Sequence, residues 1–96
     1  MPFAQLSQTK LQVKQEIEQA YLGAKIAQEK LKAAQRQILV QQMAYDSAKE
    51  RYLEGLLHTI ELNTFRINLE KAKSNLIQSK YEFYFRKVIL NYYGNR

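Results

Sequence analysis

The sequence predicts an all-α protein, a long antiparallel two-helix coiled-coil hairpin that turns near Gly55. Two observations carry this prediction. Apolar and small residues recur at alternating steps of three and four on both sides of Gly55, which is the spacing of a coiled-coil seam. The second observation is the scarcity of helix breakers, since the 96 residues include one proline and three glycines. The whole chain, 1–96, is therefore expected to form a single hairpin.

The first helix is expected over about residues 8–52. Gln, Glu, Lys and Ala dominate this stretch, and only Gly23 weakens it, by about 1 kcal/mol relative to alanine. At about 1.5 Å per residue such a helix is about 70 Å long, so the molecule is a rod rather than a compact globule. Its seam positions hold Val13, Ile17, Ala20, Ala24, Ala27, Leu31, Ala34, Ile38, Gln41, Tyr45, Ala48 and Tyr52.

The turn is expected over about residues 53–58 and the second helix over about 59–93. Gly55 accepts the positive φ that often follows a helix end. Thr59 is a candidate cap for the second helix, and Gly94 is a candidate stop. The seam positions of the second helix hold Leu62, Phe65, Leu69, Ala72, Leu76, Ser79, Phe83, Arg86 and Leu90.

When the chain is folded at Gly55, small seam residues face large ones. Such alternation lets two long helices pack closely. The predicted pairs are Ala48 with Leu62, Ile38 with Ala72, Ala34 with Leu76, Leu31 with Ser79, Ala27 with Phe83 and Ala20 with Leu90, and the exception is Tyr45 with Phe65, where two large residues meet.

Further apolar residues lie off the seam of both helices. A two-helix seam does not need them, so they predict that the hairpin pairs into a larger helical bundle. For the isolated hairpin, an antiparallel dimer forming a four-helix bundle is the simplest solution. The residues are Leu22, Ile26, Ala33, Leu39, Val40, Met43, Ile67, Ile77, Tyr81, Tyr84, Val88 and Tyr92.

The composition limits the classes of function. The formal net charge is +6, but Lys and Arg alternate with Glu and Gln as they do on solvated helix faces, and no nucleic-acid-binding motif is present. The chain has no cysteine, which excludes disulfides and thiolate metal sites. The first ten residues lack an apolar run, so no signal peptide is expected, and no apolar run is long enough for a membrane span.

No catalytic, cofactor or metal site is expected. His58 has Glu54 and Glu61 at spacings that metal ligands use on helices, but Gly55 interrupts the helix between the first two, and a surface histidine at a turn is the favoured interpretation. The serines have no histidine at a useful spacing, and the glycines are too far apart for a phosphate-binding loop. The sequence therefore predicts a protein that is not an enzyme.

One combination of motifs resembles a known family. The run Arg51-Tyr52-x-x-Gly55-x-x-x-Thr59-x-x-Leu62 resembles the periplasmic tip of the second coiled-coil hairpin in TolC-type outer-membrane efflux proteins. The resemblance covers nearly the whole chain, because further matches follow in order. They are Ala20-Tyr21-Leu22, Ala72, Ser79-Lys80-Tyr81-x-Phe83, and the ending Leu90 and Gly94.

This resemblance implies a function. Proteins of this family are trimers whose helical hairpins form a tunnel through the periplasm, and whose hairpin tips gate the tunnel and meet a periplasmic adaptor (membrane fusion) protein. The chain would then be a fragment of a larger channel, lacking the barrel strands and the first hairpin, in the periplasmic part of an outer-membrane protein. The partner-binding tip would comprise Arg51, Tyr52, Gly55, Leu56, Leu57, His58 and Thr59.

The tip departs from the family at Leu57, where some members carry a basic residue that helps to close the aperture. An apolar Leu56-Leu57 tip would instead dock by burial. Two other interpretations stay open. The first is a cytosolic coiled-coil scaffold whose tip binds another protein. The second is a nucleic-acid-binding hairpin driven by the +6 charge, whose binding would weaken steeply with salt.

Overall fold

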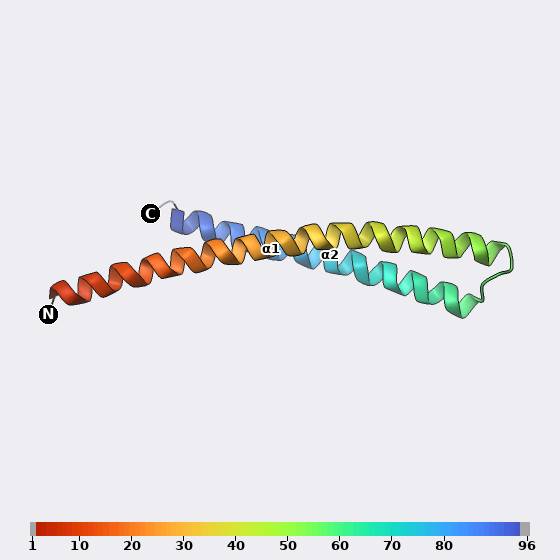
Figure 1. The fold of residues 1–96 in the computed structure, drawn as a ribbon, viewed down its shortest axis with the longest axis horizontal. Helices are drawn as coiled ribbons and strands as arrows, with labels where there is room; N and C mark the ends of the chain where they lie inside the picture. Colours follow the sequence, from red (N-terminus) through yellow and green to blue (C-terminus); the bar gives the residue numbers. More distant parts are fainter. Residues whose placement is uncertain (1, 95–96) are drawn as a thin grey trace.

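The computed structural model describes the backbone of residues 2–94 and the side chains of residues 6–94. Within this part of the chain, helix α1 spans Pro2–Leu53 and helix α2 spans Thr59–Gly94, joined by a short turn. The two helices run antiparallel and form a rod of 79 × 20 × 13 Å (Figure 1). The prediction of an all-α hairpin with its turn near Gly55 is confirmed.

Helix α1 begins earlier than the sequence pattern indicated, at Pro2 rather than near Gln8. Proline is tolerated in the first turn of a helix because the N–H that it lacks would have no intrahelical partner there. Nothing between Pro2 and Gln8 interrupts the helix. At about 1.5 Å per residue, α1 alone accounts for nearly the full length of the rod.

The seam between the helices is built mostly from alanine. Side chains of 0–7% exposure form its buried line, and all of them occupy predicted seam positions. Larger seam residues such as Leu31, Phe65 and Phe83 are half-buried against them. Small side chains let the two backbones approach closely, which is why the rod is narrow. The buried residues are Ala24, Ala27, Ala34, Ala48, Leu69, Ala72 and Ser79.

Contacts at three heights of the rod fix the register. Near the turn, the Thr59 and Tyr52 hydroxyl oxygens are 3.5 Å apart. Midway, Lys30 Nζ lies 3.8 Å from Glu82 Oε1. Near the open end, a Cβ built on Gly23 would lie 3.5 Å from Arg86 Nη1. These contacts match a chain folded at Gly55.

The helices differ in length, and this corrects the predicted seam at its open end. In the observed register Gly94, the last residue of α2, lies about level with Glu16 of α1, so the first turns of α1 extend past α2 (Figure 1). Val13 and Ile17 continue the seam spacing, yet each is 37% exposed, because α2 ends at about the level of Ile17 and before that of Val13. At the seam's edge on α2, Arg86 is exposed and lies along Gly23.

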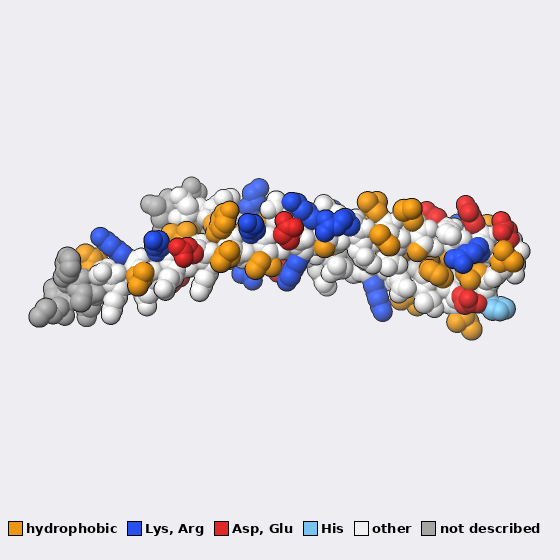
Figure 2. Space-filling model, in the orientation of Figure 1, with side chains coloured by type: hydrophobic (Ala, Val, Ile, Leu, Met, Phe, Trp, Pro, Cys, Tyr) orange, Lys and Arg blue, Asp and Glu red, His pale blue; other side chains and the backbone are white. Residues whose placement is uncertain are grey.

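Much of the large apolar surface is left uncovered. The off-seam residues of both helices are exposed, as expected, including Leu39 at 65% and Met43 at 72%. Figure 2 shows such side chains scattered along the rod between the charged ones. Among the described residues only one large side chain, Leu69, counts as buried. The hairpin therefore has a thin core and a wide apolar exterior.

Candidate docking site at the hairpin tip

The end of α1 is held by its own backbone. Gly55 has a φ of +79°, the left-handed conformation that glycine adopts without penalty. Its N–H donates to the Tyr52 carbonyl at 3.0 Å, and the Leu56 N–H donates to the Arg51 carbonyl at 2.8 Å. This pair of bonds is the Schellman motif, which satisfies carbonyls that a helix end leaves without partners. Gly55 is therefore required by the turn itself.

The start of α2 differs from the predicted cap. Thr59 is the first helical residue, so His58 occupies the capping position before it. The His58 carbonyl accepts from the Leu62 N–H at 3.0 Å, and the His58 N–H donates to Glu61 Oε1 at 3.4 Å. The Glu61 contact is one half of a capping box, in which the third helical residue reaches back to the capping residue. Thr59 itself does not cap the helix.

The Thr59 hydroxyl instead bridges the turn. It donates to the Tyr52 hydroxyl at 3.5 Å, at the long end of hydrogen-bond distances. This contact joins the last turn of α1 to the first turn of α2. Tyr52, predicted as a seam residue, is 37% exposed and so closes the seam at its edge.

The surface of the tip is apolar with an acidic surround. Leu53, Leu56 and Ile60 are 74%, 70% and 82% exposed, whereas Leu57 is half-buried. Glu50, Glu54 and Glu61 lie at or near the turn, at the same end of the rod. Figure 2 shows red and orange side chains gathered at this end beside the single histidine. These three aliphatic side chains lie close in sequence around the turn and give it apolar surface that a partner can bury.

The structure places the predicted tip residues in two groups. Backbone atoms of Arg51, Tyr52, Gly55 and Leu56 form the turn, and side chains of Tyr52 and Thr59 meet across it. The Arg51 side chain is exposed and joins no ion pair among the described residues. Leu53 was predicted within an apolar turn but not among the partner-binding residues, and Ile60 was not predicted as tip surface at all. For Ile60 a signal existed, because an isoleucine off the seam spacing at a helix start has no neighbour to cover it.

The tip offers an exposed apolar surface for binding. Within the described residues, no group of three His, Cys, Asp or Glu side chains is close enough to hold a metal ion, and His58 contacts Glu61 through its backbone N–H only. The depression beside the turn, lined by Tyr45, Thr59, Leu62, Asn63 and Arg66, is small. Burial of Leu53, Leu56 and Ile60 is what this surface offers to a partner.

Comparison with known proteins identifies no relative. No protein-family model matches the chain, and neither the curated proteins nor the solved structures contain a match. In the part of the chain that the structure describes, neither helix has an apolar stretch that could cross a membrane.

Proposed function

We propose that this chain is a wall element of a larger helical assembly whose tip docks a partner protein. In finer terms, the proposal is a periplasmic hairpin of a TolC-type outer-membrane efflux or secretion channel, with a periplasmic adaptor protein as the partner of the tip. The proposal combines the exposed apolar surface of the hairpin with the sequence motifs around Gly55.

The role in a larger helical assembly is supported by the distribution of apolar side chains, because small ones are buried and large ones are exposed. The buried line consists of alanines, one serine and Leu69, while large side chains such as Leu39, Val40 and Met43 lie on the surface. Full burial of one such side chain stabilises an assembly by about 1.5–3 kcal/mol. A hairpin with this distribution gains more from neighbouring helices than from its own core.

The tip geometry supports the docking role. Four members of the motif that resembles the TolC-type tip have distinct parts in one turn. Arg51 and Tyr52 supply the carbonyl acceptors, Gly55 supplies the left-handed residue, and Thr59 reaches back to Tyr52. The turn is thereby fixed by backbone and polar contacts, which leaves Leu56 and Ile60 free for a partner.

Capture by purified periplasmic adaptors tests this function. The variants Leu56→Glu and Ile60→Glu place a charge in the exposed apolar tip without altering the turn contacts, so we expect capture to be lost. The matched control is Met43→Glu, an equally exposed apolar residue on the shaft that should retain capture. Circular dichroism checks that all three variants stay helical.

The outcomes separate the proposal from its alternative. Loss at the tip with retention at Met43 supports adaptor docking. Absence of capture for the unmodified hairpin by every adaptor, with the helical fold intact, would overturn the channel assignment and favour a coiled-coil scaffold with an unrelated partner.

A further inference from the structure

Helix α2 carries a second apolar row on its outer side, away from the buried seam. Positions 77, 81, 84 and 88 are spaced by four, three and four residues, which repeats the seam spacing on another face. All members are exposed, from 46% at Ile67 to 72% at Tyr81. We call this row the outer stripe, and it consists of Ile67, Ile77, Tyr81, Tyr84 and Val88, with Glu70 and Ser74 at the seam-spaced positions between the first two.

A row of cations borders the outer stripe. Its members are exactly one heptad apart, about 10 Å along the helix axis, and all are exposed. Lys80 lines a shallow depression together with Ile77, Tyr81 and Tyr84, so this cation and the apolar side chains beside it form one surface. We call this row the basic row, and it consists of Arg66, Lys73, Lys80 and Lys87.

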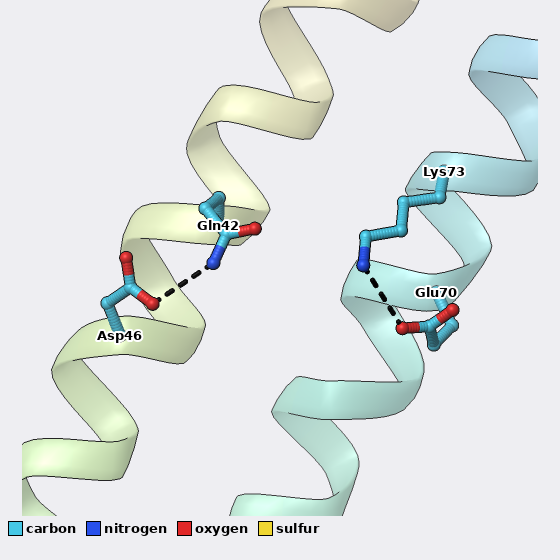
Figure 3. Close-up of polar contacts among 4 residues, drawn as sticks. All are labelled: Gln42, Asp46, Glu70 and Lys73. Atoms are coloured by element: carbon cyan, nitrogen blue, oxygen red, sulfur yellow. Dashed lines mark hydrogen bonds and ion pairs between the residues drawn. The ribbon is translucent and has the colours of Figure 1, made fainter.

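The hairpin does not neutralise the basic row across its seam. Lys73 contacts only Glu70 of its own helix, at 3.4 Å (Figure 3). Lys80 and Lys87 form no ion pair with any described residue, and Arg66 bonds to the Asn63 side chain.

The facing residues of α1 explain why. In the observed register they are Tyr21, Gln28, Gln35 and Gln42, and the first two line a depression together with Lys87. Gln42 bonds to Asp46 of its own helix at 3.0 Å, as Figure 3 also shows. The opposite side of the rod differs, because there Lys30 pairs with Glu82 across the seam.

An ordinary solvated face carries charges of both signs, whereas the basic row has one sign at every heptad position. In coiled coils, the charges that flank an apolar seam select the partner helix. An apolar stripe with a uniformly cationic flank is therefore complementary to an apolar helix with a carboxylate flank.

A second copy of this chain does not supply that flank. The apolar residues Ile26 and Val40 on the outer side of α1 have three cations beside them and one carboxylate, so packing them on the outer stripe would bring mostly like charges together. The cations are Lys25, Lys30 and Arg36, and the carboxylate is Glu29. No two acidic residues within either helix are seven positions apart. Self-association through this face is therefore disfavoured by charge.

We infer that the outer stripe of α2 is a second coiled-coil seam, and that it docks an acidic α-helix from outside this 96-residue sequence, with carboxylates at heptad spacing facing the basic row. The inference concerns a surface separate from the tip and does not depend on the adaptor proposal. It specifies the partner by chemistry, as an amphipathic helix of about three heptads, the length of the outer stripe.

A pair of synthetic helices tests the inference. Both peptides carry identical apolar residues at seam spacing, and they differ only in the flanking positions, which are Glu in one and Lys in the other. Fluorescence anisotropy of each labelled peptide with the full chain measures binding. We expect the Glu peptide to bind about tenfold or more tightly than the Lys peptide, and to weaken as salt is raised.

Two protein variants locate the site. The first reverses three members of the basic row, Lys73→Glu, Lys80→Glu and Lys87→Glu, and should weaken binding of the Glu peptide about tenfold or more. The second reverses three exposed lysines of α1, Lys10, Lys14 and Lys49, also to Glu. Both variants have the same net charge, so the second should bind within about twofold of the unmodified chain. Circular dichroism confirms helicity, and Lys→Gln versions replace any variant that loses it.

Other results would overturn the inference. Equal losses in the two variants would show a net-charge effect without a site. Binding of polyglutamate or of a DNA duplex as tight as that of the Glu peptide would show a general affinity for polyanions. Sedimentation showing dimers that dissociate when Tyr81 and Tyr84 are changed to Ala would assign the stripe to a second copy.

Discussion

The shaft and the tip of this hairpin are ordered by different means. Along the shaft, alanines such as Ala27 and Ala34 repeat the same close contact between helices over many turns. At the tip, a few backbone hydrogen bonds and one left-handed glycine, Gly55, fix the chain. The shaft is thus stabilised by many similar packing contacts. The tip depends instead on a few hydrogen bonds and on the left-handed conformation of Gly55, which do not recur elsewhere in the described part of the hairpin.

The two regions also differ in charge. Residues 50–61 contain three carboxylates and one guanidinium, that of Arg51, whereas the chain as a whole has a net charge of +6. The basic row lies on the shaft and the acidic residues surround the apolar tip. Partners of the two surfaces are therefore expected to differ in chemistry, and one protein helix is not expected to bind both.

The largest effect on stability is expected at the one large side chain that the shaft buries. Leu69 is 4% exposed, so Leu69→Ala removes much of the local seam and should lower the free energy of unfolding by about 2–4 kcal/mol. Leu39→Ala, at a residue that is 65% exposed, should change it by less than about 0.5 kcal/mol. Urea unfolding followed by circular dichroism measures both, and equal effects would contradict a continuous seam.

The second-largest loss of stability is expected when a buried alanine of the seam is replaced by a larger residue. Ala34 is 2% exposed, so Ala34→Leu must push the helices apart and should cost about 1–3 kcal/mol. The neighbouring Ala33 is exposed, so Ala33→Leu is the matched control and should be nearly neutral. Thermal unfolding of the pair measures the difference. A stable Ala34→Leu variant would show that the helices are not closely packed at this height.

The sequence predicted the shaft well because the seam pattern repeats over many turns, and each turn supports the same register. It predicted Val13 and Ile17 as seam residues but could not show that α2 ends about level with Ile17 and short of Val13, since that depends on the lengths of the two helices together. The start of α1 was predicted near Gln8 because Ser7 and Thr9 are favoured capping residues, whereas the helix begins at Pro2, a residue type that fits the first turn of a helix.

The tip was predicted in outline only. Gly55 was identified because a left-handed residue after a long helix is a strong local signal. The cap of α2 was assigned to Thr59 because threonine is a favoured capping residue, but the helix starts at Thr59 and Glu61 bonds to the His58 N–H. Which of two adjacent residues leaves the helical conformation depends on the path of the turn, which composition does not encode.

Replacing a glycine by alanine is expected to change the free energy of unfolding in opposite directions at the tip and on the shaft. Gly55 has open space around a built Cβ but a φ of +79°, so Gly55→Ala should cost about 1–2 kcal/mol through the backbone alone. Gly23 lies within α1, and a Cβ there would make ordinary contact with Arg86, so Gly23→Ala should stabilise the hairpin by about 0.5–1 kcal/mol. Denaturant midpoints measure both. Changes of the same sign would contradict the left-handed turn.

The smallest effect is expected at the polar contact across the turn. Tyr52→Phe removes the hydroxyl that Thr59 contacts at 3.5 Å, in a partly exposed setting where water can replace it. The free energy of unfolding should therefore change by less than about 0.5 kcal/mol, far less than for Leu69→Ala. If Tyr52→Phe leaves unfolding unchanged but weakens capture by an adaptor, the hydroxyl serves the partner rather than the fold. A loss of stability comparable to that of Leu69→Ala would instead show that the tip, and not the seam, holds the two helices together.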